Sequence, residues 1–191
     1  MGKHRLLPHP GAPAASIEAV EVEVVRTGAE AVLLRFSVTG GELALPARCA
    51  PERADDLWQT TCFELFLRPP GSPAYFEFNF SPSSRWAAYA FESHRHGRRD
   101  LRLRVAPVVD PDPDGEGGSG AAAYALEAEV DLSDLPPAAL RMGLSAIVEE
   151  TDGTRSYWAL AHPPGDKPDF HDPSSFVLEL PAYHPPPSPR T

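Results

Sequence analysis

Two glutamates stand in the middle of two phenylalanine-rich segments. Glu64 lies within CFELFL (62–67), and Glu77 lies within YFEFNF (75–80). Two carboxyl groups held close together can serve as an acid and base pair, share a proton, or bind the hydroxyl groups of a polar ligand. The chemistry open to them therefore depends on whether the chain brings both side chains to one surface.

The two segments are predicted to form a β-hairpin. Each is rich in aromatic residues, and RPPGSP (68–73) between them is rich in turn residues. If the strands pair directly across this turn, Glu64 faces Glu77, while a shift of two residues would change partners but keep the same faces. The phenylalanines Phe63, Phe76 and Phe78 then form a core face with Leu65. The glutamates share the other face with Cys62, Phe66, Tyr75 and Asn79.

Like charges directly opposite destabilise a sheet, so the two glutamates require compensation. One interpretation is a solvated outer face with an arginine nearby, for which Arg35 is a candidate. The other is a concave polar face, bordered by aromatic rings, that binds a ligand. The next predicted strand, 86–91, brings either Tyr89 or Trp86 to this face, depending on its register.

The rest of the chain also alternates between apolar and polar residues, which is typical of strands. About ten antiparallel strands separated by proline and glycine turns predict a single all-β sandwich, immunoglobulin-like or jelly-roll. One short helix is expected over 133–140. We expect an extended head over 1–16, one domain over 17–180 and a proline-rich tail over 181–191. Further strands are expected at 17–25, 31–39, 43–45, 101–108, 123–132, 141–151, 156–160 and 174–180.

The composition limits the classes of partner. The 191 residues carry a net charge of −10, which opposes broad binding to nucleic acid or to an anionic membrane. Two cysteines form no disulfide framework. The first residues lack the apolar core of a signal peptide, and no segment is long enough to span a membrane, so we expect a cytoplasmic protein.

Two loops carry further chemistry. HPPGDKPDFH (162–171) contains His162, Asp169 and His171, whose spacing matches no known zinc motif, so we expect no metal and a loop in which these residues cap backbone groups. SHRHGRRD (93–100) is basic. It could hold an anionic ligand such as a phosphate or a uronic acid, or balance acidic neighbours as a solvated loop.

Three segments carry a resemblance to a known family. LWQTTCFELFL (57–67), YFEFNFSPSSRWAAYAF (75–91) and YWALAHPPGDKPDFHDPSSF (157–176) resemble DOMON-like bacterial proteins. Their superfamily includes the family-nine carbohydrate-binding modules. The resemblance covers most of residues 17–180 and implies a β-sandwich with a ligand site on or beside one sheet. Superfamily members bind sugars or haem.

For a sugar, the resemblance implies aromatic rings against the apolar face of the ligand and polar side chains at its hydroxyls. We therefore expect a non-catalytic module that binds a carbohydrate or a similar small polar ligand. The predicted ligand-binding residues are Trp58, Glu64, Tyr75, Glu77, Asn79, Trp86, Tyr89 and Trp158.

Three alternatives remain open. A small glycoside-active enzyme could use Glu64 and Glu77 as a carboxylate pair. A haem module would need a methionine and a histidine as axial ligands; Met142 with His94, His96, His162 or His171 forms no recognisable haem motif, so we expect no cofactor. In the third alternative, the chain is a structural or partner-binding domain whose glutamate face is solvated.

Overall fold

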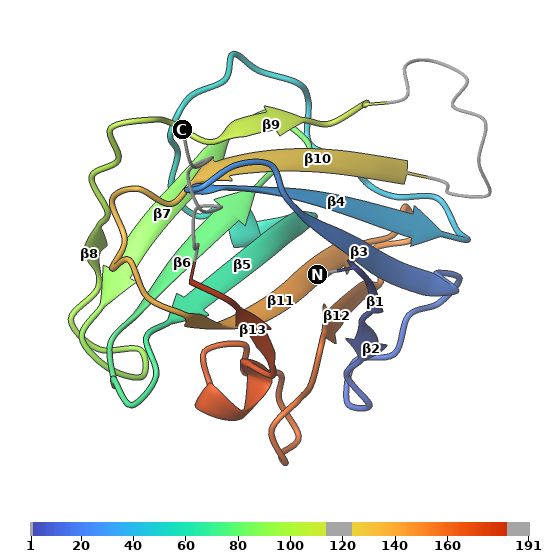
Figure 1. Cartoon of the computed structure of the whole chain (residues 1–191). Coiled ribbons are helices and arrows are strands. Elements are labelled where there is room, and N and C mark those ends of the chain that lie inside the picture. The colour runs from blue at the N-terminus through green and yellow to red at the C-terminus, as the bar shows by residue number, and fades with distance from the viewer. Residues whose placement is uncertain (1, 114–123, 183–191) are drawn as a thin grey trace.

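The computed structural model describes residues 2–113 and 124–182. In this part of the chain, two antiparallel sheets face each other (Figure 1). Sheet A contains, in spatial order, β1 (Gly2–Arg5), β3 (Ala19–Arg26), β4 (Ala31–Thr39), β10 (Tyr124–Asp131) and β9 (Val108–Asp110). Sheet B contains β2 (Leu7–Pro8), β12 (Arg155–Ala159), β11 (Leu140–Glu149), β5 (Cys62–Arg68), β6 (Tyr75–Phe80), β7 (Trp86–Phe91) and β8 (Arg99–Asp100), with β13 (Leu178–Leu180) beside β11.

The prediction of an all-β sandwich is confirmed, but the short helix over 133–140 is wrong. These residues form turns up to β11, which begins at Leu140. Pro136 and Pro137 have no backbone N–H to donate, and the Asp131 carboxylate accepts the backbone N–H of Ser133. Among the described residues, helical structure is limited to the 3₁₀ turns η1 (Leu57–Gln59) and η2 (Pro173–Ser175), so no helix there is long and apolar enough to cross a membrane.

The predicted strand over 101–108 is also wrong for most of its length. Only β8 before it and β9 at its end are paired. The backbone N–H of Arg104 donates to the Asp134 carboxylate at 2.7 Å, so it takes no part in a ladder. Leu101 and Leu103 nevertheless pack against the core, which explains why this segment alternates as a strand would.

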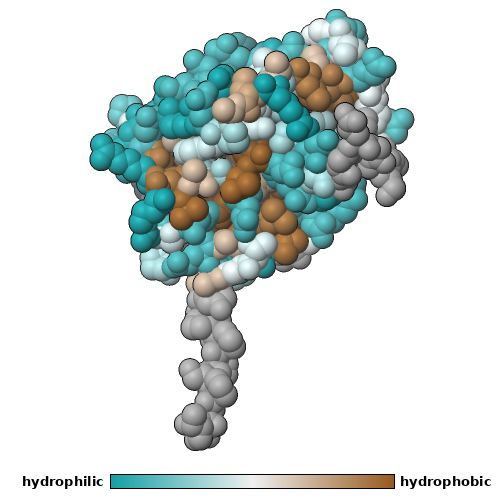
Figure 2. Space-filling view, turned by 90° about the horizontal axis from the view of Figure 1, so that it is seen from above, coloured by the Kyte–Doolittle hydropathy of each residue, from teal (hydrophilic) through white to brown (hydrophobic). Residues whose placement is uncertain are grey.

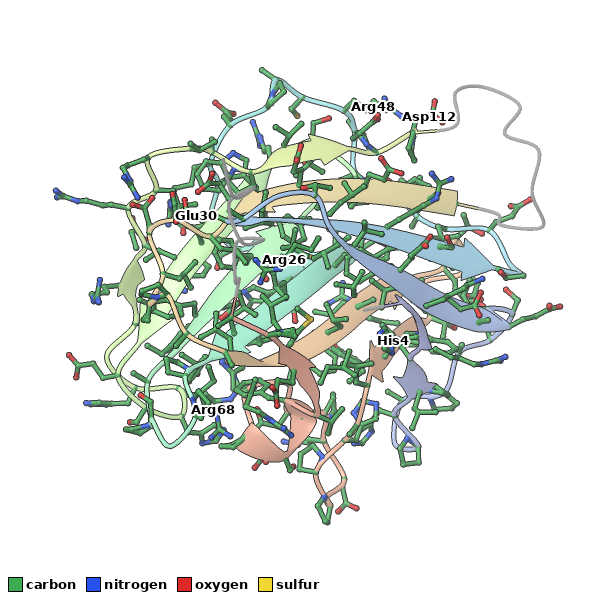
Figure 3. All side chains as sticks on the ribbon, viewed as in Figure 1. His4, Arg26, Glu30, Arg48, Arg68 and Asp112 are labelled. Atoms are coloured by element: carbon green, nitrogen blue, oxygen red, sulfur yellow. The ribbon has the colours of Figure 1, made fainter. Side chains whose placement is uncertain are left out.

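The sequence pattern predicted the strands at the edges of both sheets less completely than the central strands. The segment 2–8, expected within an extended head, contributes β1 to sheet A and β2 to sheet B. The predicted strand over 43–45 reduces to one isolated pairing between Leu43 and Glu150. Farther along, Arg48 and Asp112 form an ion pair at 3.7 Å that joins the 46–57 segment to the end of β9 (Figure 3). The tail from residue 183 onward lies outside the described residues.

The main core lies between the two sheets and follows the predicted alternation. Val20, Val22 and Val24 of β3 point inward, as do Leu34 and Phe36 of β4, and all are buried. Sheet B supplies the other half of the core. Its inward side chains include Phe63, Leu65, Phe78, Phe80, Leu144, Ala146, Val148 and Trp158.

The β5–β6 hairpin has the predicted faces and a register shifted by two residues. Glu64 pairs with Asn79, and Phe66 pairs with Glu77, so the predicted pairing of Glu64 with Glu77 is wrong. Strand β6 begins at Tyr75 and pairs with β5 from Phe76 onward, and just before it the backbone N–H of Ala74 donates to the Ser72 hydroxyl within the turn. The two glutamates are therefore diagonal neighbours on one face of sheet B.

The outer face of sheet B is buried as well, beneath the chain segments that follow β12 and precede β5. A second apolar cluster forms there, in which Phe176 stacks on Phe66 with ring centroids 5.7 Å apart. Gly143 provides the space, because a Cβ atom at that position would lie 2.5 Å from the Phe176 ring. The cluster comprises Leu57, Cys62, Phe66, Tyr75, Ala87, Tyr89, Phe91, Ile147, Ala159, Phe170 and Phe176.

The surface seen from above is mostly hydrophilic, and its hydrophobic residues form separate patches (Figure 2). Among the large exposed apolar side chains, Leu45 lies between β4 and β5, whereas Val105 and Val108 lie just before and at the start of β9. Isolated apolar side chains of this kind are normal on a protein surface.

Candidate functional site

A pocket of about 690 Å³ opens over the outer face of sheet B, next to the second apolar cluster. This volume lies within the range usual for small-molecule sites, about 300–1,000 Å³. The sheet provides the floor, η1 one wall, and the loops 92–98 and 167–171 the others. The lining residues are Trp58, Glu64, Glu77, Tyr89, Phe91, Arg95, Arg98, Ile147, Tyr157, Lys167, Pro168, Phe170 and His171.

The floor of the pocket carries the two glutamates, which are 3% and 6% exposed respectively. The Ser145 hydroxyl donates to Glu64 Oε2 at 2.8 Å, and Asn79 Nδ2 donates to Glu77 Oε1 at 2.9 Å. Arg35, a candidate to compensate them on a solvated face, lies in sheet A and pairs with Glu127, so it does not do so. Neutral donors therefore satisfy part of each carboxyl group.

Burial raises the pKa of both carboxyl groups. The pKa of Glu64 rises to about 8, first because burial disfavours its charged form and second because Glu77 lies nearby. The pKa of Glu77 is also raised by burial, against the lowering effects of Asn79, Arg95 and Arg98. At neutral pH, Glu64 thus holds its proton and can donate a hydrogen bond.

Trp58 forms the wall contributed by η1 and is 47% exposed. Asp56, two positions before Trp58, has φ 60°. This left-handed conformation turns the chain into η1. Asp55 anchors the turn, because its carboxylate accepts the Tyr89 hydroxyl at 2.6 Å and pairs with Arg53. The tryptophan is therefore held at the pocket by a fixed turn rather than by packing in the core.

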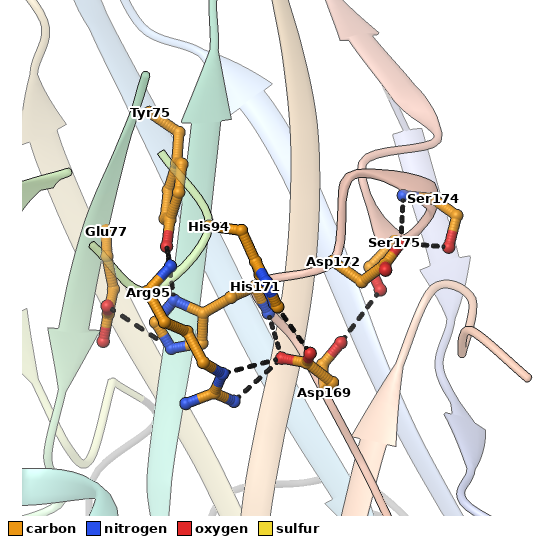
Figure 4. Close-up of polar contacts among 9 residues, drawn as sticks. All are labelled: Tyr75, Glu77, His94, Arg95, Asp169, His171, Asp172, Ser174 and Ser175. Atoms are coloured by element: carbon orange, nitrogen blue, oxygen red, sulfur yellow. Dashed lines mark hydrogen bonds and ion pairs between the residues drawn. The ribbon is translucent and has the colours of Figure 1, made fainter. Parts of the chain in front are cut away.

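The basic loop after β7 forms a second wall. Arg95 binds the Asp169 carboxylate through Nε at 3.1 Å and Nη2 at 2.8 Å, and His94 Nε2 contacts its other oxygen at 2.8 Å (Figure 4). Asp169 also accepts the backbone N–H of His171. These contacts join the loop 92–98 to the loop 163–172.

His171 connects this junction to the floor. Its Nδ1 lies 2.8 Å from the Tyr75 hydroxyl, which accepts the backbone N–H of Arg95 at 3.1 Å (Figure 4). Its Nε2 lies 3.9 Å from Glu77 Oε2. Burial, with a smaller effect of Arg95, lowers the pKa of His171 to about 3. The imidazole is therefore neutral, and the hydroxyl contact at Nδ1 favours the tautomer whose Nε2–H points toward Glu77.

The structure brings some predicted ligand-binding residues together and separates others. Trp58, Glu64, Glu77, Tyr89 and His171 line the pocket. Tyr75 and Asn79 lie on the same face and support His171 and Glu77 through hydrogen bonds. Trp86 pairs with Phe80 and Trp158 with Pro8; both tryptophans lie on the core side of sheet B, and His162 contacts the Leu7 carbonyl outside the pocket.

Sequence reasoning missed part of the lining. Arg95 and Arg98 lie in the basic loop whose capacity for an anion was recognised, but no pattern placed that loop beside the glutamates. Lys167 and Phe170 belong to the proline-rich loop, and Tyr157 to β12. Parity along β12 could have grouped Tyr157 with Ile147, once β11 was known to pair with it.

Within the described residues, Met142 and the histidines considered as haem ligands lie apart. Met142 is buried between the sheets, whereas His94 and His171 lie in loops over the outer face of sheet B. Within residues 2–113 and 124–182, no group of three or more histidine, cysteine, aspartate or glutamate side chains is arranged to hold a metal ion.

No protein-family model matches the chain, and no curated protein matches it significantly. Solved structures do. A candidate carbohydrate-binding protein from Bacteroides uniformis shares 16% identity over 93% of this chain and 84% of its own, with a TM-score of 0.67. A family-nine carbohydrate-binding module from Caldicellulosiruptor kristjanssonii, solved with cellotriose, shares 12% identity over 94% of this chain and 82% of its own, with a TM-score of 0.52. The chain therefore has the β-sandwich fold seen in family-nine carbohydrate-binding modules.

Proposed function

We propose that the chain is a non-catalytic module that binds a carbohydrate, or a similar small polar ligand, in the pocket over the outer face of sheet B. The carrying observation is the combination of an exposed tryptophan on one wall with buried, hydrogen-bonding glutamates on the floor. A pyranose needs both features, because it presents an apolar face to a ring and hydroxyl groups to polar side chains.

The remaining lining suits the same ligand. Tyr157 and Phe170 add aromatic surface, with ring centroids 6.2 Å apart, and Tyr89 lies beside Glu77 in the ladder. A protonated Glu64 offers a hydrogen-bond donor, and Glu77 offers an acceptor. The floor can therefore bind both the oxygen and the hydrogen of a sugar hydroxyl. The likeness to sandwiches solved as carbohydrate-binding proteins supports this proposal.

Tryptophan fluorescence tests the proposal directly. Trp86 and Trp158 lie on the core side of sheet B, so a change in emission on ligand addition reports mainly on Trp58. Titration with glucose, cellotriose and a panel of other mono- and oligosaccharides is expected to give a saturable change for at least one sugar. The Trp58→Ala variant should lose both the signal and, by calorimetry, most of the affinity.

Val108→Ala is the matched control, because Val108 is exposed and lies outside the pocket. It should bind as the parent protein does. Binding that survives Trp58→Ala unchanged, or the absence of binding to every sugar tested, would contradict the proposal.

Catalysis by Glu64 and Glu77 is the competing function, and the raised pKa of Glu64 is the observation that favours it. Against it, both side chains are almost fully buried, and Glu64 Oε2 is already occupied by the Ser145 hydroxyl. We expect no turnover of activated aryl glycosides. An enzyme would release the aryl group and lose this activity in Glu64→Gln, whereas a binding module should keep most of its affinity in that variant.

A further inference from the structure

We propose that the ligand of this pocket carries an oxyanion, either a carboxylate or a phosphate, and that Arg98 and Lys167 bind that group at the pocket mouth. This inference rests on the proposed carbohydrate-binding function and deepens it, because it names the chemical class of the ligand.

Three cationic side chains line the pocket: Arg95, Arg98 and Lys167. They come from two loops that are far apart in the sequence, and all three are exposed, so they surround the mouth rather than the floor. The whole chain carries a net charge of −10, so an excess of cations here is not the average of its surface. Clustered cations beside a cleft are a common means of binding an anion.

Within the residues that the structure describes, two of the three cations form no close ion pair with a carboxylate, although Arg98 acts at longer range on Asp55 and Glu77. Arg95 is paired with Asp169, which occupies its Nε and Nη2 atoms. The Arg98 guanidinium instead lies over the Tyr89 ring, 4.9 Å from its centroid, and no ion pair within 4 Å engages Arg98 or Lys167 in that part of the chain. Their hydrogen-bond donors remain available for a ligand.

The floor does not repel an anion as strongly as its two glutamates suggest. Glu64 is neutral at physiological pH, since its pKa lies at about 8, and His171 is neutral as well. Glu77 is the other carboxyl group lining the pocket; burial raises its pKa as well, and it already accepts from Asn79. The negative charge of a ligand would therefore face the mouth, with its neutral hydroxyl groups toward the floor.

The basic loop 92–98 is held in one conformation. A loop that only balanced the charge of acidic neighbours would not need a fixed conformation. Arg95 has φ 55°, a left-handed conformation that costs a non-glycine residue about 1 kcal/mol or more. Its backbone N–H is fixed by the Tyr75 hydroxyl, and the turn is closed by a hydrogen bond from His96 N to Ser93 O at 2.9 Å. Together with the Asp169 contacts in Figure 4, this geometry keeps Arg98 and Lys167 at the same opening.

Pairs of sugars that differ only by a charged group measure how much that group contributes to the affinity. Isothermal titration calorimetry would compare methyl glucoside with methyl glucuronide, and glucose with glucose 6-phosphate. We expect the charged member of at least one pair to bind about tenfold or more tightly. The glucuronide identifies a carboxylate ligand and the sugar phosphate a phosphate ligand. Raising sodium chloride from 50 to 500 mM should weaken the charged member more than the neutral one.

Two variants test the residues. Arg98→Gln and Lys167→Gln should each lower the affinity for the charged sugar about tenfold and leave the affinity for its neutral partner within about twofold. Arg102→Gln is the control, because Arg102 is exposed and does not line the pocket. It should change neither affinity.

The outcomes distinguish this inference from the proposed function. Neutral sugars that bind as tightly as their charged partners would overturn the inference and leave carbohydrate binding standing. Failure of every sugar to bind would overturn both. Inorganic phosphate that binds as tightly as glucose 6-phosphate, with no neutral sugar bound, would support an anion site and overturn the carbohydrate function.

Discussion

Glu64 lies directly opposite Asn79 in the β5–β6 ladder, and not opposite Glu77. The amide of Asn79 therefore separates two carboxyl groups that the alternation alone would place face to face, and its Nδ2 donates to Glu77. Its Oδ1 atom is buried without a partner among the described residues, which favours a protonated Glu64 across the ladder. The neutral amide is thus the element that makes two buried glutamates tolerable.

Replacing the Asn79 amide by a carboxyl group should lower the stability of the folded protein. Asn79→Asp removes the donor to Glu77 and places a third acid in the buried floor, so we expect the free energy of unfolding to fall by about 2–4 kcal/mol at pH 7. Urea denaturation measures the change. Gln59→Glu adds an equal charge at an exposed position and should change stability by less than about 0.5 kcal/mol. Equal effects of both substitutions would contradict a special role for Asn79.

Glu64 should make stability depend on pH in a definite direction. Its folded pKa of about 8 exceeds the ordinary glutamate pKa of 4.5, so the folded state holds a proton that the unfolded state releases. The contribution of Glu64 is therefore fully present below about pH 4.5 and is lost as the pH rises through 8. Glu64→Gln cannot ionise and keeps an acceptor for Ser145. Its unfolding free energy should decline less over this interval, as measured by denaturation at several pH values.

His171 should make the protein less stable as the pH falls, the opposite pH dependence to that of Glu64. Its pKa is lowered from 6.5 to about 3, so the unfolded state takes up a proton that the folded state refuses. Stability contributed by the neutral imidazole is present above pH 6.5 and is lost as the pH falls from 6.5 toward 3. His171→Gln should flatten this loss, whereas His96→Gln, at an exposed position, should not. The ring resonances of His171 should also shift with a midpoint near pH 3 by nuclear magnetic resonance, as Nδ1 takes up a proton.

Gly143 should tolerate no side chain. A methyl group there would lie 2.5 Å from the Phe176 ring, which is itself wedged against Phe66. Gly143→Ala is expected to lower the melting temperature and cost about 1–3 kcal/mol by overpacking. Gly28→Ala provides the comparison, because its added Cβ would meet only the Ala31 Cβ at 4.0 Å. A Gly143→Ala protein as stable as the Gly28→Ala protein would show that Phe176 moves without cost.

Alternation along the sequence was sufficient to predict the sandwich and the faces of the hairpin. A period of two determines parity, so the phenylalanines and glutamates of β5 and β6 could be assigned to opposite faces. Parity cannot distinguish a register from one shifted by two residues. The shift accompanies the conformation of the turn, which includes a hydrogen bond from Ala74 N to the Ser72 hydroxyl that no alternation pattern reveals.

The site was harder to predict, because it is made by loops. Glu64 and Glu77 could be grouped from strand parity, but whether Tyr89 or Trp86 joined them depended on the β6–β7 register. Trp158 was expected at the ligand and lies in the core, since strand β12 turns that residue inward. Arg95 and Asp169 lie 74 positions apart in the sequence, so only the folded chain shows that their loops meet.

The bond between Arg95 and Asp169 also limits how the pocket can be redesigned. Each of the two loops carries one partner of this contact, in which Nε and Nη2 of Arg95 both donate to Asp169 Oδ1, so a loop transplanted from another sandwich would arrive without its counterpart. It would leave a carboxylate or a guanidinium unpaired beside the opening. A chimera intended to change ligand preference should therefore exchange residues 92–98 and 163–172 together, as a single interchangeable cassette.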